Sequence, residues 1–91
     1  MGGKTHKMYY VYILRNTFNY KLYKGYTEDL RKRISEHNRN KVRSTKYKGK
    51  LILIYYEAFI NKSDALREEK FLKTGKGRER LKFLLENAMK K

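Results

Sequence analysis

The pattern of apolar and polar positions divides the chain into alternating strands and helices. Residues 9–14, with the sequence Tyr-Tyr-Val-Tyr-Ile-Leu, are aromatic and β-branched, as a strand requires. A second short run covers residues 22–26, and the turn-forming residues Asn16 and Asn19 lie between the two runs. Because asparagine favours tight turns, this pattern predicts an antiparallel hairpin.

A third strand is predicted over residues 51–59. Its first four residues, Leu-Ile-Leu-Ile, are all apolar and do not alternate with polar ones. A continuous apolar run is typical of a strand that is buried on both faces. We therefore expect this strand to be the central or best-covered strand of the sheet.

The first helix is predicted to follow Thr27 and to end near residue 38. Thr27 can cap this helix, and Glu28 and Asp29 come next, at the positive end of the helix dipole. Residues 38–50 then form a predicted loop that is rich in lysine and arginine. We interpret this loop as an arm that grips phosphate groups.

Two further helices complete the pattern. Ser63 can cap a helix over about residues 64–74, and Gly75 is expected to end that helix with a left-handed turn. A third helix carries an apolar stripe at i, i+3, i+4 and i+7, formed by Leu81, Leu84, Leu85 and Ala88. The order of elements predicts an α/β (α+β) fold, in which a small three-stranded antiparallel sheet is flanked by three helices.

The composition narrows the class of protein. The 91 residues contain no cysteine and no proline, and they describe a single domain over residues 9–91 that follows a flexible basic tail over residues 1–8. The absence of cysteine is compatible with a reducing compartment. No apolar run approaches the roughly 20 residues that span a bilayer, and the start of the chain lacks the hydrophobic region of a signal peptide. We expect a cytoplasmic protein with no membrane partner and no small-molecule cofactor.

The charge of the chain indicates a polyanionic partner. The formal net charge is +15, from 24 Lys and Arg residues against 9 Asp and Glu residues. Lysine and arginine side chains that neutralise phosphates release counterions, which gives affinity without base specificity. On charge alone, a solvated surface or a ribosome-bound protein is as good an explanation as a specific function on DNA or RNA. The cations that we expect to bind nucleic acid are Lys24, Arg31, Lys32, Arg39, Lys41, Arg43, Lys46 and Lys48.

One carboxylate falls on an apolar helix face. At 100° per residue, Glu69 shares an arc of the second helix with Ala65, Leu66 and Leu72. Desolvating an unpaired carboxylate costs several kcal/mol, so Glu69 needs a cation, a hydrogen-bond network or a metal ion. An i, i+4 ion pair with Lys73 is the simpler explanation. The preceding Glu68 is expected to point outward as surface charge.

Two cations border the apolar face of the first helix. Leu30 and Ile34 lie on the core side, with Arg33 and His37 beside them and one turn apart. Arg33 can reach a pocket between helix and sheet, where a guanidinium group can hold a phosphate with two hydrogen bonds. A lone histidine is usually structural, so the proximity of Arg33 is what makes His37 a candidate.

Two tyrosine-centred strings, Tyr10-Val11-Tyr12 and Tyr23-Lys24-Gly25, place two tyrosines eleven residues apart. This spacing resembles the signature of the GIY-YIG nuclease family. The segments over residues 25–37 and 65–69 resemble the later blocks of the same family, so that the likeness covers most of the chain. It is strongest to the small stand-alone bacterial members, which resemble nuclease modules of excision repair, homing endonucleases and resolvases. The chain departs from the family pattern in two positions, where Tyr10 replaces a glycine and Lys24 an isoleucine.

The resemblance implies a single-metal endonuclease that hydrolyses phosphodiester bonds of DNA, with RNA as the alternative substrate. Such an enzyme is expected to recognise structure or backbone more than sequence. The matching catalytic positions are Tyr12, Tyr23, Arg33, His37 and Glu69, with Glu69 as the ligand of Mg²⁺ or Mn²⁺. We favour Tyr12 as the base that activates water and Tyr23 as its orienting partner, although the sequence leaves the two roles open. The alternatives are a nucleic-acid-binding module of weak or no activity, and a basic ribosome-associated protein.

Overall fold

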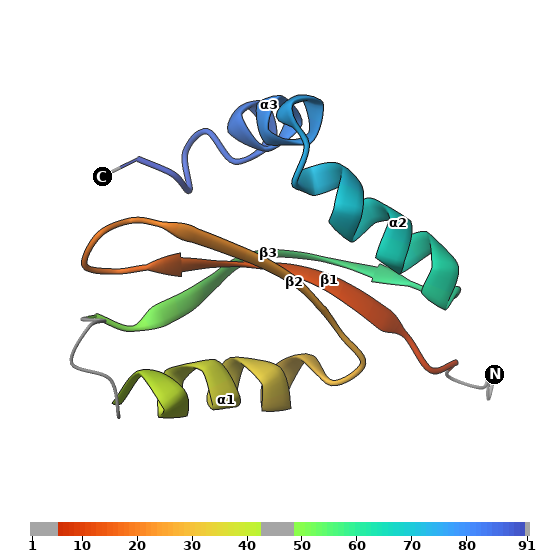
Figure 1. The fold of residues 1–91 in the computed structure, drawn as a ribbon, viewed down its shortest axis with the longest axis horizontal. Helices are drawn as coiled ribbons and strands as arrows, with labels where there is room; N and C mark the ends of the chain where they lie inside the picture. Colours follow the sequence, from red (N-terminus) through yellow and green to blue (C-terminus); the bar gives the residue numbers. More distant parts are fainter. Residues whose placement is uncertain (1–5, 43–48, 91) are drawn as a thin grey trace, which may run out of the picture.

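The predicted three-stranded antiparallel sheet with three helices is confirmed (Figure 1). The structure, a computed structural model, describes residues 6–42 and 49–90, except for the side chains of residues 40–42. The elements in chain order are β1 (Tyr9–Asn16), β2 (Leu22–Thr27), α1 (Leu30–Val42), β3 (Leu51–Phe59), α2 (Lys62–Leu72) and α3 (Gly75–Leu84). No helix within the described ranges is both long and apolar enough to cross a membrane.

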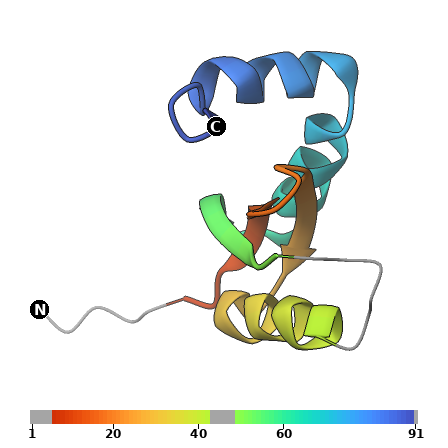
Figure 2. The ribbon, with the colours of Figure 1, turned by 90° about the vertical axis from the view of Figure 1, so that its left-hand side faces the viewer.

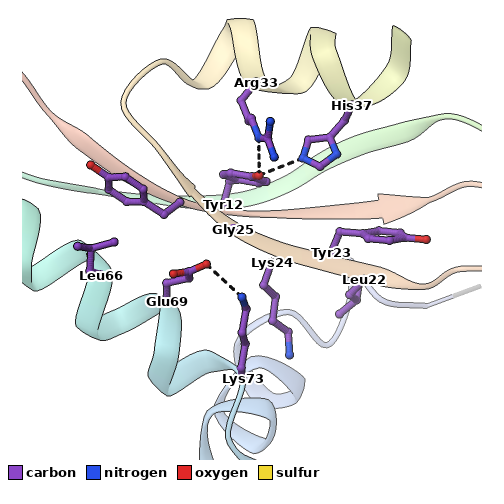
Figure 3. Close-up of a pocket in the computed structure, with 11 residues that line it drawn as sticks. Tyr12, Leu22, Tyr23, Lys24, Gly25, Arg33, His37, Leu66, Glu69 and Lys73 are labelled. Atoms are coloured by element: carbon purple, nitrogen blue, oxygen red, sulfur yellow. Dashed lines mark hydrogen bonds and ion pairs between the residues drawn. The ribbon is translucent and has the colours of Figure 1, made fainter. Parts of the chain in front are cut away.

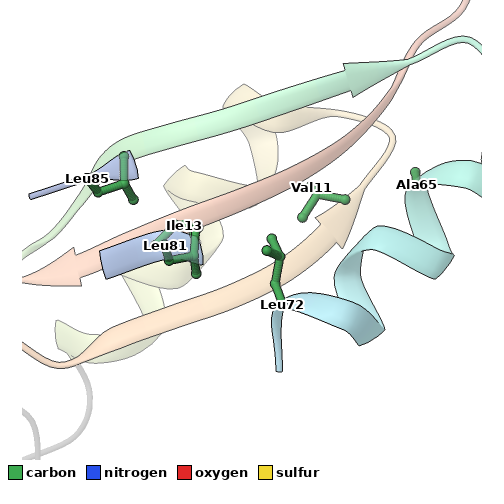
Figure 4. Packing of buried hydrophobic residues seen from close by; sticks show 6 residues of the cluster. All are labelled: Val11, Ile13, Ala65, Leu72, Leu81 and Leu85. Carbon is green, nitrogen blue, oxygen red and sulfur yellow. The ribbon is translucent and has the colours of Figure 1, made fainter. Parts of the chain in front are cut away.

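The sheet lies between two helical layers, with α1 on one face and α2 and α3 on the other (Figures 1 and 2). Because successive side chains of a strand point to opposite faces, β1 contributes to both cores. Val11 and Ile13 pack with apolar residues of α2 and α3 (Figure 4). Tyr12 and Leu14 pack on the other face, against Leu51 and the apolar side of α1.

The strand order is β2-β1-β3, so the prediction that residues 51–59 form the central strand is wrong. The central strand is β1, which is buried from Val11 to Asn16. Strand β3 lies at an edge, and its Ile52 is 45% exposed. The pairing of β1 with β3 also shifts register between Ile13 and Leu14, which shows that an extra residue is accommodated in β3. An apolar run therefore did not indicate which strand has neighbours on both sides.

The ends of α1 differ from the prediction. Asp29 is the capping residue, because its Oδ1 accepts a hydrogen bond from the backbone N–H of Lys32 at 3.1 Å. Thr27 acts one step earlier, since its Oγ1 accepts from the N–H of Asp29 at 3.1 Å. The helix then continues to Val42, beyond the predicted end at residue 38. Most of the predicted phosphate-gripping loop consequently lies either in α1 or in residues 43–48, outside the described residues.

The ends of α2 also need correction. Asn61 caps the helix in place of Ser63, accepting a hydrogen bond from the Ser63 N–H at 2.8 Å. The predicted glycine stop is wrong, because α2 ends at Lys73 in a right-handed conformation and Gly75 begins α3. Thr74 caps α3 through the N–H of Gly77 at 3.1 Å, so the two helices follow each other with almost no connection.

Candidate active site

A pocket of about 580 Å³ opens at the outer edge of β2 and draws its walls from both faces of the sheet (Figure 3). All five side chains that the sequence assigned to catalysis line this pocket: Tyr12, Tyr23, Arg33, His37 and Glu69. They come from β1, β2, α1 and α2. The folded chain thus brings together residues that are up to 57 positions apart in the sequence, from 12 to 69.

The hydroxyl group of Tyr12 is the centre of the α1 side of the pocket. It accepts a hydrogen bond from Arg33 Nε at 3.2 Å, and it lies 3.0 Å from His37 Nε2 (Figure 3). The Tyr12 and His37 rings also meet edge to face, with centroids 5.8 Å apart. Tyr12 is only 3% exposed, so its ring is fixed by packing and its oxygen by two neighbours.

Gly25 is what lets the Tyr12 ring reach this position. It lies opposite Tyr12 in the β1–β2 ladder, and a Cβ atom at position 25 would lie 2.3 Å from Tyr12 Oη. Such a contact is far shorter than a van der Waals distance, so any side chain here would displace the Tyr12 hydroxyl group. Close packing therefore requires glycine at position 25. This requirement is a physical reason for the glycine in the string Tyr23-Lys24-Gly25.

The electrostatic setting of Tyr12 favours a neutral histidine beside a charged arginine. Burial lowers the pKa of His37, and the neighbouring Arg33 charge lowers it further, against a smaller opposite effect of Glu36. The hydrogen bond to Tyr12 raises the pKa of Arg33, which keeps the guanidinium group charged. With His37 neutral and its proton on Nδ1, Nε2 can accept the Tyr12 proton while Arg33 donates to the same oxygen.

Glu69 forms the α2 side of the pocket, across β2 from Arg33 (Figure 3). Its carboxylate is 21% exposed and pairs with Lys73 Nζ at 3.1 Å, so the simpler explanation for its position on the apolar face is confirmed. The ion pair does not remove Glu69 from the pocket, because both partners line it.

The prediction that Glu68 is surface charge is wrong. Its side chain is only 19% exposed and accepts a hydrogen bond from Arg80 at 2.9 Å. The helical wheel assigned Glu68 to solvent because it considered α2 alone, whereas α3 packs beside α2 and supplies Arg80.

The donor set fits a hard divalent cation that takes most of its ligands from elsewhere. Within the described ranges no group of three His, Cys, Asp or Glu residues could hold a metal ion. Glu69 is the one carboxylate among the residues that line the pocket. Mg²⁺ commonly binds through one or two carboxylates together with substrate phosphates and water. Glu69 can provide that single contact if it turns away from Lys73.

The predicted nucleic-acid-binding cations fall into three groups. Arg31, Lys32 and Arg39 are exposed on α1. Lys24 lines the pocket and donates a hydrogen bond from Nζ to the backbone oxygen of Leu72 at 3.0 Å. Lys41 lies in α1 with its side chain outside the described residues, and Arg43, Lys46 and Lys48 lie wholly outside them.

Four side chains of the pocket were not assigned a functional role from the sequence. Leu22, Tyr26, Leu66 and Lys73 contribute to the walls. Tyr26 directly follows Gly25 of the tyrosine-glycine string. This position was the sequence signal that could have indicated a pocket residue. Tyr10 shares a sheet face with Tyr12, as the alternation predicts, but its ring contacts Tyr56 at a centroid distance of 6.0 Å and does not line the pocket.

The chain is similar to known proteins over most of its length. Residues 8–82 match the profile described as the GIY-YIG catalytic domain. A UPF0213 protein of Staphylococcus haemolyticus is 39% identical over 79 residues, which cover 86% of this chain and 95% of that protein. A UPF0213 protein of Streptococcus pyogenes serotype M3 is 40% identical over 75 residues, covering 81% of this chain and 80% of that protein.

A solved structure shares the fold. The solution NMR structure of the UPF0213 protein BH0048 from Bacillus halodurans superposes with a TM-score of 0.54 at 34% identity, covering 85% of this chain and 84% of that one. The profile match spans most of the chain, and the five predicted site residues, which all lie within the matched range, line one pocket. The chain belongs to the GIY-YIG catalytic domain family, in the company of the small bacterial UPF0213 proteins.

Proposed function

We propose that this protein is a metal-dependent endonuclease that hydrolyses phosphodiester bonds of DNA. The observation that supports the proposal most directly is the pair of contacts to Tyr12 Oη, with Arg33 Nε at 3.2 Å and His37 Nε2 at 3.0 Å. These contacts place a proton acceptor on one side of the phenol oxygen and a fixed positive charge on the other, an arrangement that suits proton transfer.

Tyr12 acts as the general base in this proposal. The neutral His37 takes the Tyr12 proton on Nε2, and Arg33 stabilises the resulting phenolate. The phenolate oxygen then accepts a proton from the water molecule that attacks phosphorus in line with the departing oxygen. Arg33 also faces the pocket and balances the charge that develops on the phosphate. Tyr23 lines the same pocket, and we assign it to orienting the water or the phosphate.

Glu69 supplies the anionic contact on the opposite side of β2. A Mg²⁺ or Mn²⁺ ion held there would act as a Lewis acid toward a phosphate oxygen or the leaving group. For that role the Glu69 carboxylate exchanges its contact with Lys73, 3.1 Å away, for the cation. The released Lys73 ammonium group is then available to a phosphate oxygen in the same pocket.

The substrate is recognised through its backbone. The net charge of +15 and the exposed cations of α1 suit contacts to phosphate groups, which position a nucleic acid without reading its sequence. Arg31, Lys32 and Arg39 lie on the helix that also carries Arg33 and His37, so a strand held along α1 passes the catalytic tyrosine. DNA is the substrate that we propose, with RNA as the alternative of the same chemistry.

The test compares cleavage of branched, single-stranded and duplex DNA with Mg²⁺ or Mn²⁺ and then with a chelator. The parent is assayed beside Glu69→Ala and Arg33→Ala, with Lys70→Ala as a control on the exposed side of α2. We expect metal-dependent nicking that the first two variants lose and the control keeps. Equal binding by every variant without cleavage of any substrate would replace the enzyme by a nucleic-acid-binding module. The Glu69–Lys73 ion pair is the observation that favours this second function, because it can hold the carboxylate without a metal.

A further inference from the structure

Three cations from three different elements meet at the carboxyl end of α2. Lys24 of β2 donates from Nζ to the backbone oxygen of Leu72 at 3.0 Å. Arg78 of α3 donates from Nη1 to the next backbone oxygen, that of Lys73, at 2.9 Å. The third cation is Lys73 itself. Carbonyl groups at a helix end carry partial negative charge and lack partners inside the helix, so these contacts bind two of the cations to a fixed frame.

The carbonyl groups use only part of the hydrogen-bonding capacity of this cluster. An ammonium group has three donor hydrogens and a guanidinium group has five, whereas each carbonyl contact takes one. Burial lowers the pKa of Lys24, and repulsion by Arg78 and Lys73 lowers it further. The carboxylate that lines the pocket beside this cluster is Glu69, which pairs with Lys73. Three positive charges thus face one negative charge, an arrangement that a bound anion would stabilise.

Two of the three cations reach the pocket that contains Tyr12, whereas Arg78 lines a second hollow that Lys24 also lines. Lys24 and Lys73 both line the Tyr12 pocket, and they lie on the α2 side of β2 while Arg33 lies on the α1 side (Figure 3). Between the two sets of cations lies Gly25 of the edge strand, with the Tyr12 hydroxyl group packed against it. A nucleic acid strand that crosses the pocket at this point meets positive charge on both sides of the edge strand.

We propose that Lys24, Lys73 and Arg78 form a second phosphate subsite, which holds the phosphate group next to the one that is cleaved. The subsite rests on the proposed function for its position relative to cleavage. Lys24 suits this role because its stem is partly buried and its ammonium group is held by a backbone oxygen. A fixed ammonium group loses less rotamer entropy on binding a phosphate than an exposed lysine does.

The test measures binding of a fluorescent DNA strand at several salt concentrations, with a chelator present so that no cleavage occurs. Lys24→Met removes the charge and keeps the buried stem, and Arg78→Gln removes a second charge while keeping a donor. Lys70→Met removes one charge from the exposed side of α2 and serves as the matched control. The slope of log Kd against log salt is expected to fall by about 0.7 for a single strand or 0.9 for a duplex when one phosphate contact is lost.

We expect this loss for Lys24→Met and Arg78→Gln, and a smaller change for Lys70→Met. A strand with one neutral methylphosphonate, moved along the sequence, locates the contact: the position that weakens the parent should have no effect on Lys24→Met. Equal slopes for Lys24→Met and Lys70→Met would reduce Lys24 to a cap of α2 and overturn the subsite even if the parent cleaves DNA. Conversely, a subsite that is found while no substrate is cleaved would contradict the proposed function alone. Thermal unfolding of each variant identifies a change that comes from loss of the fold.

Discussion

Two clusters of polar side chains each include a glutamate of α2, and they differ in what their polar groups face. In the first, Tyr12, Arg33 and His37 converge on one oxygen atom at the wall of the pocket, with Glu69 across from them. In the second, which we name the Arg80 cluster, Arg80 binds Glu57 at 3.3 Å and Glu68 at 2.9 Å, and Tyr55 donates to Glu57 at 2.6 Å. The polar groups of the pocket are accessible to a ligand, whereas those of the Arg80 cluster bind one another.

The contrast is sharpest for Glu68 and Glu69, which are consecutive residues of one helix with nearly equal exposure of 19% and 21%. Exposure therefore does not distinguish these two carboxylates. The partners do: Glu68 is held by α3 and stands beside Glu57 of β3, whereas Glu69 is held by a lysine of its own helix. A helix-internal pair can be exchanged for a ligand without separating two elements of the fold.

The largest expected effect contrasts these two glutamates. Glu69→Gln should lower the cleavage rate by about 10² to 10³, as is typical when one preorganised electrostatic group is removed from an active site. Glu68→Gln should leave the rate within a few-fold of the parent. Single-turnover cleavage with Mg²⁺ measures both. Equal losses in the two variants would show that α2 as a whole matters, and not the carboxylate that faces the pocket.

Two glycines allow a similar comparison, because one packs against the backbone of the fold and the other against a side chain of the pocket. A Cβ atom at Gly77 would lie 2.0 Å from the backbone oxygen of Phe71, and one at Gly25 would lie 2.3 Å from the side-chain oxygen of Tyr12. Backbone cannot yield as a ring can, so Gly77→Ala should destabilise the fold by about 1 to 3 kcal/mol through overpacking. Gly25→Ala should instead displace Tyr12, reducing cleavage more than stability. Urea unfolding and cleavage rates are compared for both variants, and the reverse ranking would contradict the close packing at Gly25.

The charge state of His37 gives a smaller, pH-dependent effect. Because burial and Arg33 lower its pKa, His37 should titrate below 6.5. Cleavage should decline only as the pH falls through this lowered pKa. Arg33→Gln removes the repulsion and should raise the His37 pKa, whereas Glu36→Gln removes an attraction and should lower it. NMR titration of the imidazole protons measures these shifts without reference to cleavage. Shifts of the same sign in both variants would refute this assignment.

The smallest expected effect concerns the Arg80 cluster and stability. Burial and then Glu57 raise the pKa of Glu68 above 4.5, whereas hydrogen bonds from Glu68, Tyr55 and Arg80 outweigh burial and lower the pKa of Glu57. A raised carboxyl pKa contributes stability that is lost as the pH rises through the folded-state value, and a lowered one contributes stability that is lost as the pH falls below 4.5.

Between pH 4.5 and 7, the unfolding free energy of the parent should therefore rise relative to that of Glu68→Gln as the pH falls. Glu57→Gln should instead flatten the loss of stability below pH 4.5. Identical pH profiles for the parent and Glu68→Gln would show that the two carboxyl groups do not share a proton. Glu69→Gln is the matched control outside this cluster.

Much of the fold could be predicted because local patterns determine it. The hairpin follows from its asparagines, and Asn16 Oδ1 indeed accepts hydrogen bonds from the backbone N–H groups of Phe18 and Asn19. The position of β3 in the sheet could not be predicted, since an apolar run describes the faces of a strand and not its lateral neighbours. Helix caps failed for a related reason: Asp29 and Asn61 compete with nearby Thr27 and Ser63, and only the folded backbone decides between them.

The candidate site could be predicted as a set of residues but not as a geometry. Helical spacing placed Arg33 and His37 on one side of α1, and the wheel placed Glu69 on the inner side of α2. Neither pattern indicates that Arg33 and His37 share one oxygen atom of Tyr12, or that Glu69 lies across the edge strand from them. Those relations depend on how α1 and α2 pack on opposite faces of the sheet, which a single-element pattern does not contain.

The two separate cores have a consequence for how the protein acquires its site during folding. The core between α1 and the sheet holds Tyr12, whereas the core between the sheet and α2 and α3 fixes the helix that carries Glu69. An intermediate in which α2 and α3 have not docked would keep Tyr12, Arg33 and His37 but lack the carboxylate. The candidate site is complete only when both layers are in place, so under the proposed function partly folded molecules of this chain would bind nucleic acid without cutting it.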